Sequence, residues 1–388
     1  MHRAILILAV LFWVPSLFAH HGAGSFDLSK TVSFTDVVLT RADLINPHAW
    51  LYFDVVKEGR SERHRCEMRS MHVLRRSGWT NEMFPIGQRV NIVASPDKYD
   101  PNSCYLQTVL FLDGSRMDRY GQYIKAPEGG LREVRGPLVT PDKRRAYRRP
   151  SGEPDISGDW APEQVVMADP RGVGGGMTPL SQLGQYKPGE RPAAGARRGC
   201  GQTAGPRLYG GAELTEAGEK AAAGFERSDN PRFRCETTSI IFDWTFDGPV
   251  NRITQNKDTI VLQYGQFGLR RTIDMNMKQH PANIKLSRAG HSIGYWEGDV
   301  LAVDTVGFLQ GVLNAPVRHS DKLHVVERFS LDPKTFALTR SYAAEDQVFL
   351  KGKYTGSDVI HMADASYSPE QCQELGSIDY SKQGQQKR

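Results

Sequence analysis

The sequence lacks the short motifs that mark the common enzyme and cofactor-binding families. It contains no Rossmann glycine fingerprint, no His-Glu-x-x-His motif and no EF-hand loop. The glycine-rich run 170–176 is not followed by the Lys-Ser or Lys-Thr of a phosphate-binding loop, so we interpret it as a flexible segment. The sequence therefore gives no evidence for a dinucleotide-binding fold, a zinc protease, an EF-hand protein or a phosphate-loop protein. Candidate sites must be inferred from where the side chains lie.

Cysteine is scarce, with five residues in a chain of 388, and no two of them form a Cys-x-x-Cys pair. A zinc knuckle is therefore not indicated, whereas disulfides are expected if the chain is exported to an oxidising compartment. We predict that Cys66 pairs with Cys104 and Cys235 with Cys372, because each pair would stay within one domain. Cys200 is then left over, and spacing alone does not determine the pairing.

Long apolar runs are absent beyond the N-terminus. The chain begins with a short positive stretch at His2 and Arg3, followed by an apolar run over 4–14, and Ala19 provides a cleavage residue. This run is too short to cross a hydrocarbon core of about 30 Å, so residues 1–19 are predicted to be a cleaved signal peptide. We expect a periplasmic or secreted protein without a transmembrane segment after signal removal.

An excess of either charge is also absent. Removal of Arg3 with the signal leaves 48 Lys and Arg against 44 acidic residues, a net charge of +4. Such a mild excess on an exported chain argues against a nucleic-acid partner. The one dense basic run, 143–149, is expected to be a solvated linker or a contact with an anionic surface.

Strand-forming segments divide the chain into two β domains. Residues 20–118 are predicted to form a small OB-like barrel of five strands and one short helix, and residues 119–231 a connector rich in Gly, Pro and Arg with one short helix. In the domain 232–388, period-two segments predict an antiparallel barrel able to hold one small ligand. Its nine expected strands are 239–246, 250–255, 259–264, 269–274, 292–296, 300–306, 323–329, 336–342 and 348–354.

The richest mixture of His, acidic and aromatic residues lies in 290–308 and 319–329. Gly298-Asp299 suits a two-residue turn, and pairing Glu297 with Val300 gives a hairpin with two distinct faces. One face, expected in the core, carries Trp296, Leu301, Val303 and Thr305, and the other carries His291, Ile293, Tyr295, Ala302 and Asp304. We predict that the polar face lines a ligand pocket in the barrel; the alternative is a solvated sheet face.

Within this stretch we assign an acid–base site. A histidine beside a carboxylate is the usual proton-transfer pair, so His291 and Asp304 are the candidate catalytic residues, with His324 and Glu327 at the mouth of the pocket. Glu327 shares its strand face with apolar neighbours, which makes it a candidate buried acid with a raised pKa. The candidate ligand-binding residues are Tyr295, Trp296, His280, His319 and Tyr264.

The predicted mature N-terminus offers a separate metal-binding hypothesis. Cleavage after Ala19 leaves His20-His21 first, and an α-amine with an imidazole on one residue chelates copper well. Cleavage one residue earlier gives Ala-His-His, which is another copper or nickel chelate. His48 is a candidate third ligand, and the alternative is a histidine-rich terminus that binds metal only incidentally.

Two sets of motifs resemble an uncharacterised family of exported bacterial proteins. Its N-terminal domain begins His-His-x3-Ser-Phe-Asp, here 20–27, and continues to Asn-Pro-His-x-Trp, here 46–50. The motifs of 290–305 and 319–329 resemble a lipocalin-like β domain. The resemblance covers most of the chain outside 119–230 and implies these folds but no activity; where similar chains carry Asp-Gly-Arg-x-His-Pro, this one has Asn-Met-Lys-Gln-His-Pro over 276–281.

Three functions follow as hypotheses. The first is an exported protein that binds, and can convert, a small organic molecule in the C-terminal barrel by His/carboxylate acid–base chemistry. The second is a periplasmic copper-binding protein that uses the N-terminal histidines. The third is an envelope interaction scaffold in which the connector wraps both barrels.

Overall fold

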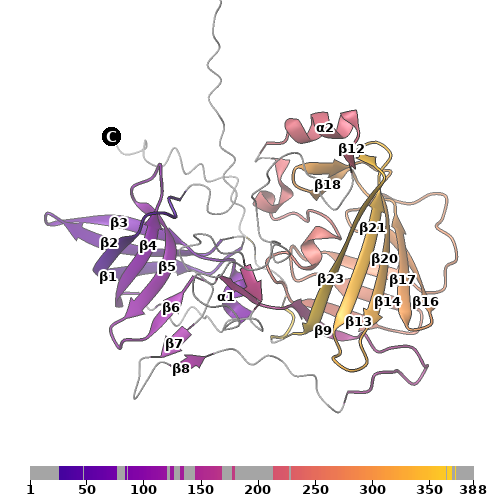
Figure 1. Cartoon of the computed structure of the whole chain (residues 1–388), viewed down its shortest axis with the longest axis horizontal. Coiled ribbons are helices and arrows are strands. Elements are labelled where there is room, and N and C mark those ends of the chain that lie inside the picture. The colour runs from indigo at the N-terminus through magenta and orange to yellow at the C-terminus, as the bar shows by residue number, and fades with distance from the viewer. Residues whose placement is uncertain are drawn as a thin grey trace, which may run out of the picture.

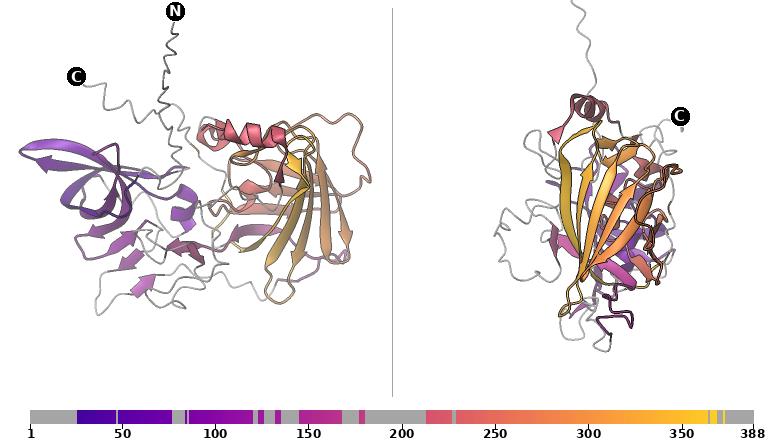
Figure 2. Two further views of the ribbon diagram at one scale, coloured as in Figure 1. Left: turned by 45° about the horizontal axis from the view of Figure 1, so that its top comes forward. Right: turned by 90° about the vertical axis from the view of Figure 1, so that its right-hand side faces the viewer.

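Two β barrels lie beside one another in the computed structural model of the chain (Figures 1 and 2). The structure describes residues 26–46, 48–76, 84, 86–119, 123–125, 132–134, 145–167, 177–179, 213–226, 229–363, 365–368 and 372. The predicted signal peptide, His20, His21 and Cys200 lie outside the described residues. Among the described residues, no helix is both long and apolar enough to cross a membrane.

The N-terminal barrel has five strands and closes on itself. The strands are ordered β3-β2-β1-β4-β5, and a parallel pairing of β3 with β5 completes the circle. The helix α1 lies between β3 and β4 in the chain, so the prediction of a small OB-like barrel is confirmed. The elements are β1 (Val32–Asp43), β2 (Trp50–Lys57), β3 (Arg60–Glu67), α1 (Met71–Arg76), β4 (Arg89–Pro96) and β5 (Ser103–Phe111), and β6 (Arg116–Asp118), β7 (Tyr123–Lys125) and β8 (Arg132–Val134) extend the sheet.

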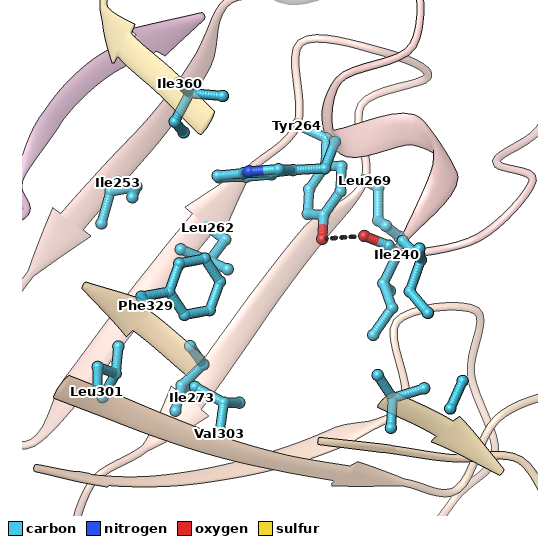
Figure 3. Close-up of a cluster of buried hydrophobic side chains, with 14 of the residues drawn as sticks. Ile240, Ile253, Leu262, Tyr264, Leu269, Ile273, Leu301, Val303, Phe329 and Ile360 are labelled. Carbon is cyan, nitrogen blue, oxygen red and sulfur yellow. Dashed lines mark hydrogen bonds between the residues drawn. The ribbon is translucent and has the colours of Figure 1, made fainter. Parts of the chain in front are cut away.

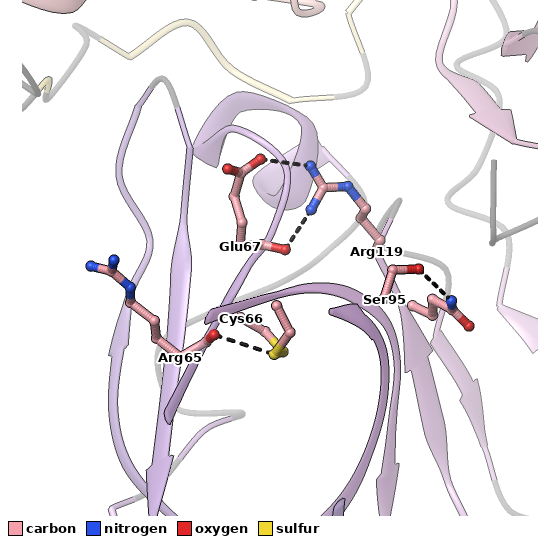
Figure 4. Close-up of a disulfide and its surroundings, with 7 residues drawn as sticks. Arg65, Cys66, Glu67, Ser95 and Arg119 are labelled. Atoms are coloured by element: carbon pink, nitrogen blue, oxygen red, sulfur yellow. Dashed lines mark hydrogen bonds and ion pairs between the residues drawn. A yellow bond between two sulfur atoms is a disulfide. The ribbon is translucent and has the colours of Figure 1, made fainter. Parts of the chain in front are cut away.

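A disulfide fastens the closure of this barrel. Cys66 of β3 and Cys104 of β5 are direct partners in the parallel pairing, and their sulfur atoms are bonded (Figure 4). The second disulfide joins Cys235 to Cys372, so both predicted pairings are confirmed. A covalent link between the two strands that complete the circle restricts the unfolded chain and so favours the closed barrel.

The C-terminal barrel is closed by nine strands, and two of the nine predicted ones differ: 239–246 is not a strand, and 348–354 overlaps the last barrel strand only at Lys353 and Tyr354. Its order is β13-β14-β15-β16-β17-β20-β21-β23-β9, where β9 (Gly158–Pro162) comes from the predicted connector. The other eight are β13 (Asn251–Gln255), β14 (Thr259–Gln263), β15 (Arg270–Asp274), β16 (His291–Glu297), β17 (Val300–Val306), β20 (His324–Leu331), β21 (Leu338–Glu345) and β23 (Lys353–Met362).

The predicted strand 239–246 is instead a short turn of 3₁₀ helix, η7 (Phe242–Trp244). The Ser239 hydroxyl accepts a hydrogen bond from the Phe242 amide at 3.0 Å, a local bond that competes with strand pairing. The turn directs Ile240, Ile241 and Trp244 into the core together, which strict alternation along a strand would not allow. β9 fills the vacated place in the barrel, with Trp160 fully buried.

Smaller elements surround the barrel. The helix α2 and the hairpin β18–β19 lie at one end of it (Figure 1). These elements are β10 (Val165–Met167), β11 (Met177–Pro179), β12 (Glu213–Leu214), α2 (Glu216–Ala223), η6 (Pro231–Arg234), β18 (Gly311–Asn314), β19 (Val317–His319) and β22 (Leu350–Lys351).

The basic run 143–149 binds the barrel of its own chain from Arg145 onward. Arg148 holds both oxygens of Asp299 at 2.8 and 2.7 Å, and Tyr147 Oη lies 3.2 Å from the same carboxylate. Arg149 donates to the Gln255 carbonyl at 2.6 Å, and Arg145 to the Asp155 carbonyl at 2.7 Å. The described part of this run is therefore a strap over the barrel, and its charges are satisfied internally.

One pairing in the barrel breaks the antiparallel pattern. β15 and β16 run parallel, with Ile273 opposite Ser292 and Asp274 opposite Ile293. Two parallel neighbours cannot be joined by a tight hairpin, so the chain needs a long crossover, which here is the segment 275–290. This crossover carries His280 to the outside of the barrel wall.

The interior of the C-terminal barrel is filled by side chains. Leu262, Ile273, Leu301 and Phe329 face each other across it, and Tyr264 extends among them toward the Ile240 carbonyl (Figure 3). Trp160 and Trp244 are also fully buried in this cluster. The ligand pocket predicted inside the barrel is therefore occupied by the protein's own core.

Candidate functional site

The β16–β17 hairpin has the predicted register and the predicted core face. Glu297 pairs with Val300, Ile293 with Asp304 and His291 with Val306, as the turn at Gly298-Asp299 predicts. Leu301, Val303 and Thr305 are buried inside the barrel as expected. The face that carries His291 and Asp304 lies on the outside of the wall, not around an internal pocket.

A buried ionic network occupies the interior beside the apolar core. Glu327 receives Arg271 Nη2 at 2.6 Å on one carboxylate oxygen and Arg340 Nη1 at 3.1 Å on the other. Arg340 also binds Asp358 at 2.5 Å, so two guanidinium groups face two carboxylates. Glu327, Arg271 and Arg340 are at most 1% exposed, which makes this pairing a requirement of the fold.

Glu327 is buried as predicted, but the predicted direction of its pKa shift is wrong. Burial by itself acts to raise the pKa of Glu327, yet the charges of Arg271 and Arg340 outweigh it and hold the pKa below its usual value. Glu327 therefore stays ionised and belongs to the interior. His324, three residues earlier on β20, points to the opposite side, so the two residues do not act together.

Three predicted ligand-binding residues are part of the packing. Tyr264 is fully buried, donates to the Ile240 carbonyl at 2.9 Å, and has its pKa raised to about 12 chiefly by burial. His319 is 5% exposed, lies under Gly311 and against Phe308, and has its pKa lowered by burial. Trp296 is half-buried against the core. Tyr264 and His319 are thereby closed off from solvent.

Four other predicted residues do come together, on the outer face. Asp304 of β17 lies between two imidazoles: its Oδ1 is 3.0 Å from His280 Nε2 and 3.1 Å from His324 Nε2. His280 Nδ1 in turn lies 2.8 Å from His291 Nδ1. We call His280, His291, Asp304 and His324 the outer-face cluster; three strands and the 275–290 crossover supply its members.

The contacts of the outer-face cluster define where its protons lie. The Asp304 carboxylate can only accept, so His280 and His324 each donate an Nε2–H to it. When His280 is neutral, its Nδ1 then accepts the Nδ1–H of His291. This arrangement leaves His291 Nε2 as an unprotonated nitrogen at the end of a chain of hydrogen bonds that begins at Asp304.

Their surroundings shift the pKa values of His291 and His324, the imidazoles at the two ends of the cluster, in opposite directions. The hydrogen bond to Asp304 raises the pKa of His324, and His324 and His280 together lower that of Asp304 against the effect of burial. Partial burial, followed by the charge of His280, lowers the pKa of His291. Near neutral pH the cluster therefore offers a neutral base at His291 and a more readily protonated acid at His324.

Tyr295 stands on the same outer face, two residues along β16 from Ile293. It is 46% exposed, and a hydrogen bond to Glu297 raises the pKa of its phenol. Glu297 is also paired with Arg328 on β20. Tyr295 is therefore available to a molecule that approaches from solvent, which is the role that the sequence predicted for it.

The N-terminal barrel holds a second His–carboxylate pair. His48 Nδ1 lies 3.0 Å from Glu67 Oε1, and Arg119 Nη2 donates to the same oxygen at 3.1 Å (Figure 4 shows the Arg119 contact). Arg119 also stacks on Tyr105, with its Cζ 3.3 Å from the ring centroid. Burial opposes ionisation of Glu67, but the charges of His48 and Arg119 lower its pKa to about 2. The His48 side chain is 29% exposed.

No group of three or more His, Cys, Asp or Glu within the described ranges is arranged to hold a metal ion. His20 and His21, the first two ligands of the copper hypothesis, lie outside those ranges. His48 is described, and its Nδ1 is already engaged by Glu67.

Sequence analysis missed Arg271, Arg340 and the Glu67–Arg119 pair. The signal for the first two is strand parity: Arg271 is two residues from buried Ile273, and Arg340 is two residues from buried Leu338. An arginine that shares a strand face with buried apolar residues needs a buried acid as its partner. Glu327 likewise shares its face of β20 with buried apolar residues. Glu67 carries no comparable local signal, because Arg119 is distant in sequence.

Comparison with known proteins reaches only the N-terminal part. Residues 9–104 match the sequence model of a family of unknown function (DUF6152). No curated protein and no solved structure matches the chain. The similarity of the N-terminal part to an uncharacterised family is thus supported, and no described relative supplies a role for the outer-face cluster.

Glu327→Gln should lower the free energy of unfolding by about 3–5 kcal/mol, because two buried guanidinium groups lose the charge that compensates them. Chemical denaturation of the mature protein measures this loss. The matched control is Glu297→Gln on the exposed face, which should leave the free energy of unfolding nearly unchanged. Equal stability of the two variants would contradict the network as a requirement of the barrel.

Acid should weaken the N-terminal barrel through Glu67. Its folded pKa of about 2 is below the ordinary 4.5, so its stabilisation is complete above pH 4.5 and is lost as the pH falls through about 2. The protection factors of the β3 and β5 amides, taken relative to the intrinsic exchange rate at each pH, should therefore fall between pH 4.5 and 2, with a total loss of about 3 kcal/mol. In Glu67→Gln this part of the pH dependence should vanish, and an unchanged profile would refute the assignment.

Proposed function

We propose that the chain is an exported protein whose C-terminal barrel binds a small organic molecule on its outer face and exchanges a proton with it. The observation that carries the proposal is the Asp304 carboxylate held between His280 and His324, with His291 joined to His280 at 2.8 Å. A carboxylate that orients imidazoles is the arrangement that general acid–base chemistry requires. The filled interior moves this chemistry to the outside of the wall.

The proton path follows from the tautomers. A ligand gives a proton to His291 Nε2, and the Nδ1 proton of His291 can pass to His280 Nδ1. The resulting imidazolium of His280 is stabilised by Asp304, to which its Nε2–H already donates. His324, whose pKa is raised, donates a proton to the ligand from its other nitrogen.

The surroundings favour a small ligand with both polar and apolar parts. Val306, the cross-strand partner of His291, places an apolar side chain beside that imidazole, and half-buried Val326 is the partner of Asp304. The exposed ring of Tyr295 extends this face. Such a face offers a small molecule hydrogen bonds to the imidazoles and an apolar contact beside them.

Export is part of the proposal, and two features support it. The N-terminal segment has the composition of a signal peptide. The two disulfides are compatible with an oxidising compartment, in which such bonds persist.

Asp304→Asn tests the proposal without knowledge of the ligand. In the native protein, NMR titration of the imidazole resonances should show His324 above an ordinary histidine pKa and His291 below it, because Asp304 stabilises the charged form of His324. The substitution removes that charge, so the pKa of His324 should fall while the fold is kept. Small polar molecules found in an NMR binding screen should shift the resonances of His291 and His324 and bind at least about tenfold more weakly to the variant.

Asp321→Asn is the control, because Asp321 is an exposed carboxylate just before β20 that accepts a hydrogen bond from Lys322 Nζ at 3.2 Å. It should leave both titrations and binding unchanged. Identical titration of His291 and His324 in the native protein would contradict the proposal. So would a screen whose binders leave both imidazoles unperturbed.

The second candidate function is copper binding by His20, His21 and His48, and one observation favours it. His48 Nδ1 lies 3.0 Å from the Glu67 carboxylate, and a carboxylate beside one nitrogen of an imidazole is common where the other nitrogen binds a metal. Copper titration of the mature protein should show one tight site that is weakened about tenfold or more in His48→Ala. An extra residue before His20 should weaken it too; unchanged affinity in both variants would eliminate this candidate.

A further inference from the structure

A small hollow lies where the two barrels meet, apart from the outer-face cluster. Its volume is about 80 Å³, which holds only a few non-hydrogen atoms, since one water takes about 30 Å³ in the liquid. Its lining comes from α1, from the residue before β13 and from the segment after β23. The lining residues are Met71, His72, Arg75, Arg76, Val250, Ala365, Ser366 and Ser368.

The α1 side of the hollow is attached to both barrels. The Met71 amide donates to the Ile45 carbonyl at 3.1 Å, which fixes the start of the helix on the N-terminal barrel. At its end, the Arg76 guanidinium donates to the carbonyls of Gly248 at 3.0 Å and Pro162 at 2.8 Å in the C-terminal half. The helix therefore bridges the junction instead of hanging from one domain.

The opposite wall, the segment 365–368, is also held in place. The Asp159 carbonyl accepts from the Ala363 amide at 2.9 Å, and the Asp159 carboxylate accepts from the Tyr367 amide at 2.9 Å. The guanidinium of Arg252 lies 5.1 Å from the centroid of the Tyr367 ring. Further along, the disulfide from Cys372 to Cys235 ties the segment to the start of the C-terminal domain. Fixed walls reduce the entropy lost when a ligand binds.

The chemistry of the lining is that of a site for an anion. No carboxylate is among the described residues that line the hollow, whereas two arginines are. Arg75 is exposed, and its guanidinium makes no hydrogen bond or ion pair within the part of the chain that the structure describes. Met71 and Val250, at 2% and 8% exposure, add an apolar floor. A guanidinium above an apolar floor suits a carboxylate that carries a short hydrocarbon part.

We propose that this hollow binds a small organic monocarboxylate. Its carboxylate pairs with Arg75 and accepts hydrogen bonds from the hydroxyls of Ser366 and Ser368, while its alkyl part rests on Met71 and Val250. The ligand then contacts α1 of one barrel and the segment that follows the other, so it ties the two barrels together. This site is independent of the acid–base chemistry assigned to the outer-face cluster.

Calorimetric titration of the mature full-length chain with sodium butyrate tests the site. We expect saturable binding that is weakened about tenfold or more in Arg75→Gln, because a charge-assisted hydrogen-bonded pair is lost. The control is Arg270→Gln, an exposed arginine of β15 whose guanidinium donates to Thr272 Oγ1 at 3.2 Å, and its affinity should equal that of the native chain. Inorganic phosphate should bind more weakly than butyrate, since it gains nothing from the apolar floor.

The proposal is overturned by the absence of saturable butyrate binding, by equal affinities of the Arg75 and Arg270 variants, or by tighter binding of phosphate than of butyrate. Arg75 is exposed, so thermal unfolding of Arg75→Gln should match that of the native protein. If that variant fails to fold, the double variant Ser366→Ala/Ser368→Ala takes its place. It should fold and bind butyrate several-fold more weakly, and native affinity would again overturn the site.

Discussion

The C-terminal barrel depends on one buried carboxylate, Glu327, held between Arg271 and Arg340. These guanidinium groups can be buried only because Glu327 and Asp358 balance their charge, and further hydrogen bonds run from Arg271 to Tyr264 and from Arg340 to the carbonyls of Ile240 and Ile241. Removing one partner would leave an uncompensated charge in the core. The network also positions the 239–246 turn across the interior, which closes the space where a barrel of this size would hold a ligand.

Because side chains fill the interior of the barrel, the candidate site lies on the outside of its wall. The parallel pair β15–β16 requires a crossover, and this crossover places His280 against Asp304 and His291. An antiparallel hairpin at this point would have been too short to bring a fourth side chain over the sheet. The one irregular pairing of the barrel is thus what completes the outer-face cluster, and the same wall keeps Glu327 and His324 on opposite sides.

Much of this arrangement could be predicted from the sequence because it depends on local rules. The Gly298-Asp299 turn determines the hairpin register, and alternation determines which residues share a face, so both were correct. Alternation also predicts the core face of the hairpin correctly, but it does not say whether the other face lines a cavity or lies outside the wall, where His291 and Asp304 are found. What fills the interior depends on long-range contacts, in which Arg340 binds Glu327 and the carbonyls of Ile240 and Ile241. β9 was missed for the same reason, since its partners β13 and β23 are distant in sequence.

The solvent exposure of single side chains tests most directly whether the imidazoles lie outside a filled barrel. In an NMR experiment with a soluble gadolinium chelate, the imidazole resonances of His291 and His324 should broaden strongly, because both lie on the outside of the wall. The ring resonances of Tyr264 and Phe329 should remain sharp, because they fill a sealed interior. Broadening of Tyr264 together with protected imidazoles would show that the barrel opens around a pocket and would contradict the placement of the chemistry on its outer face.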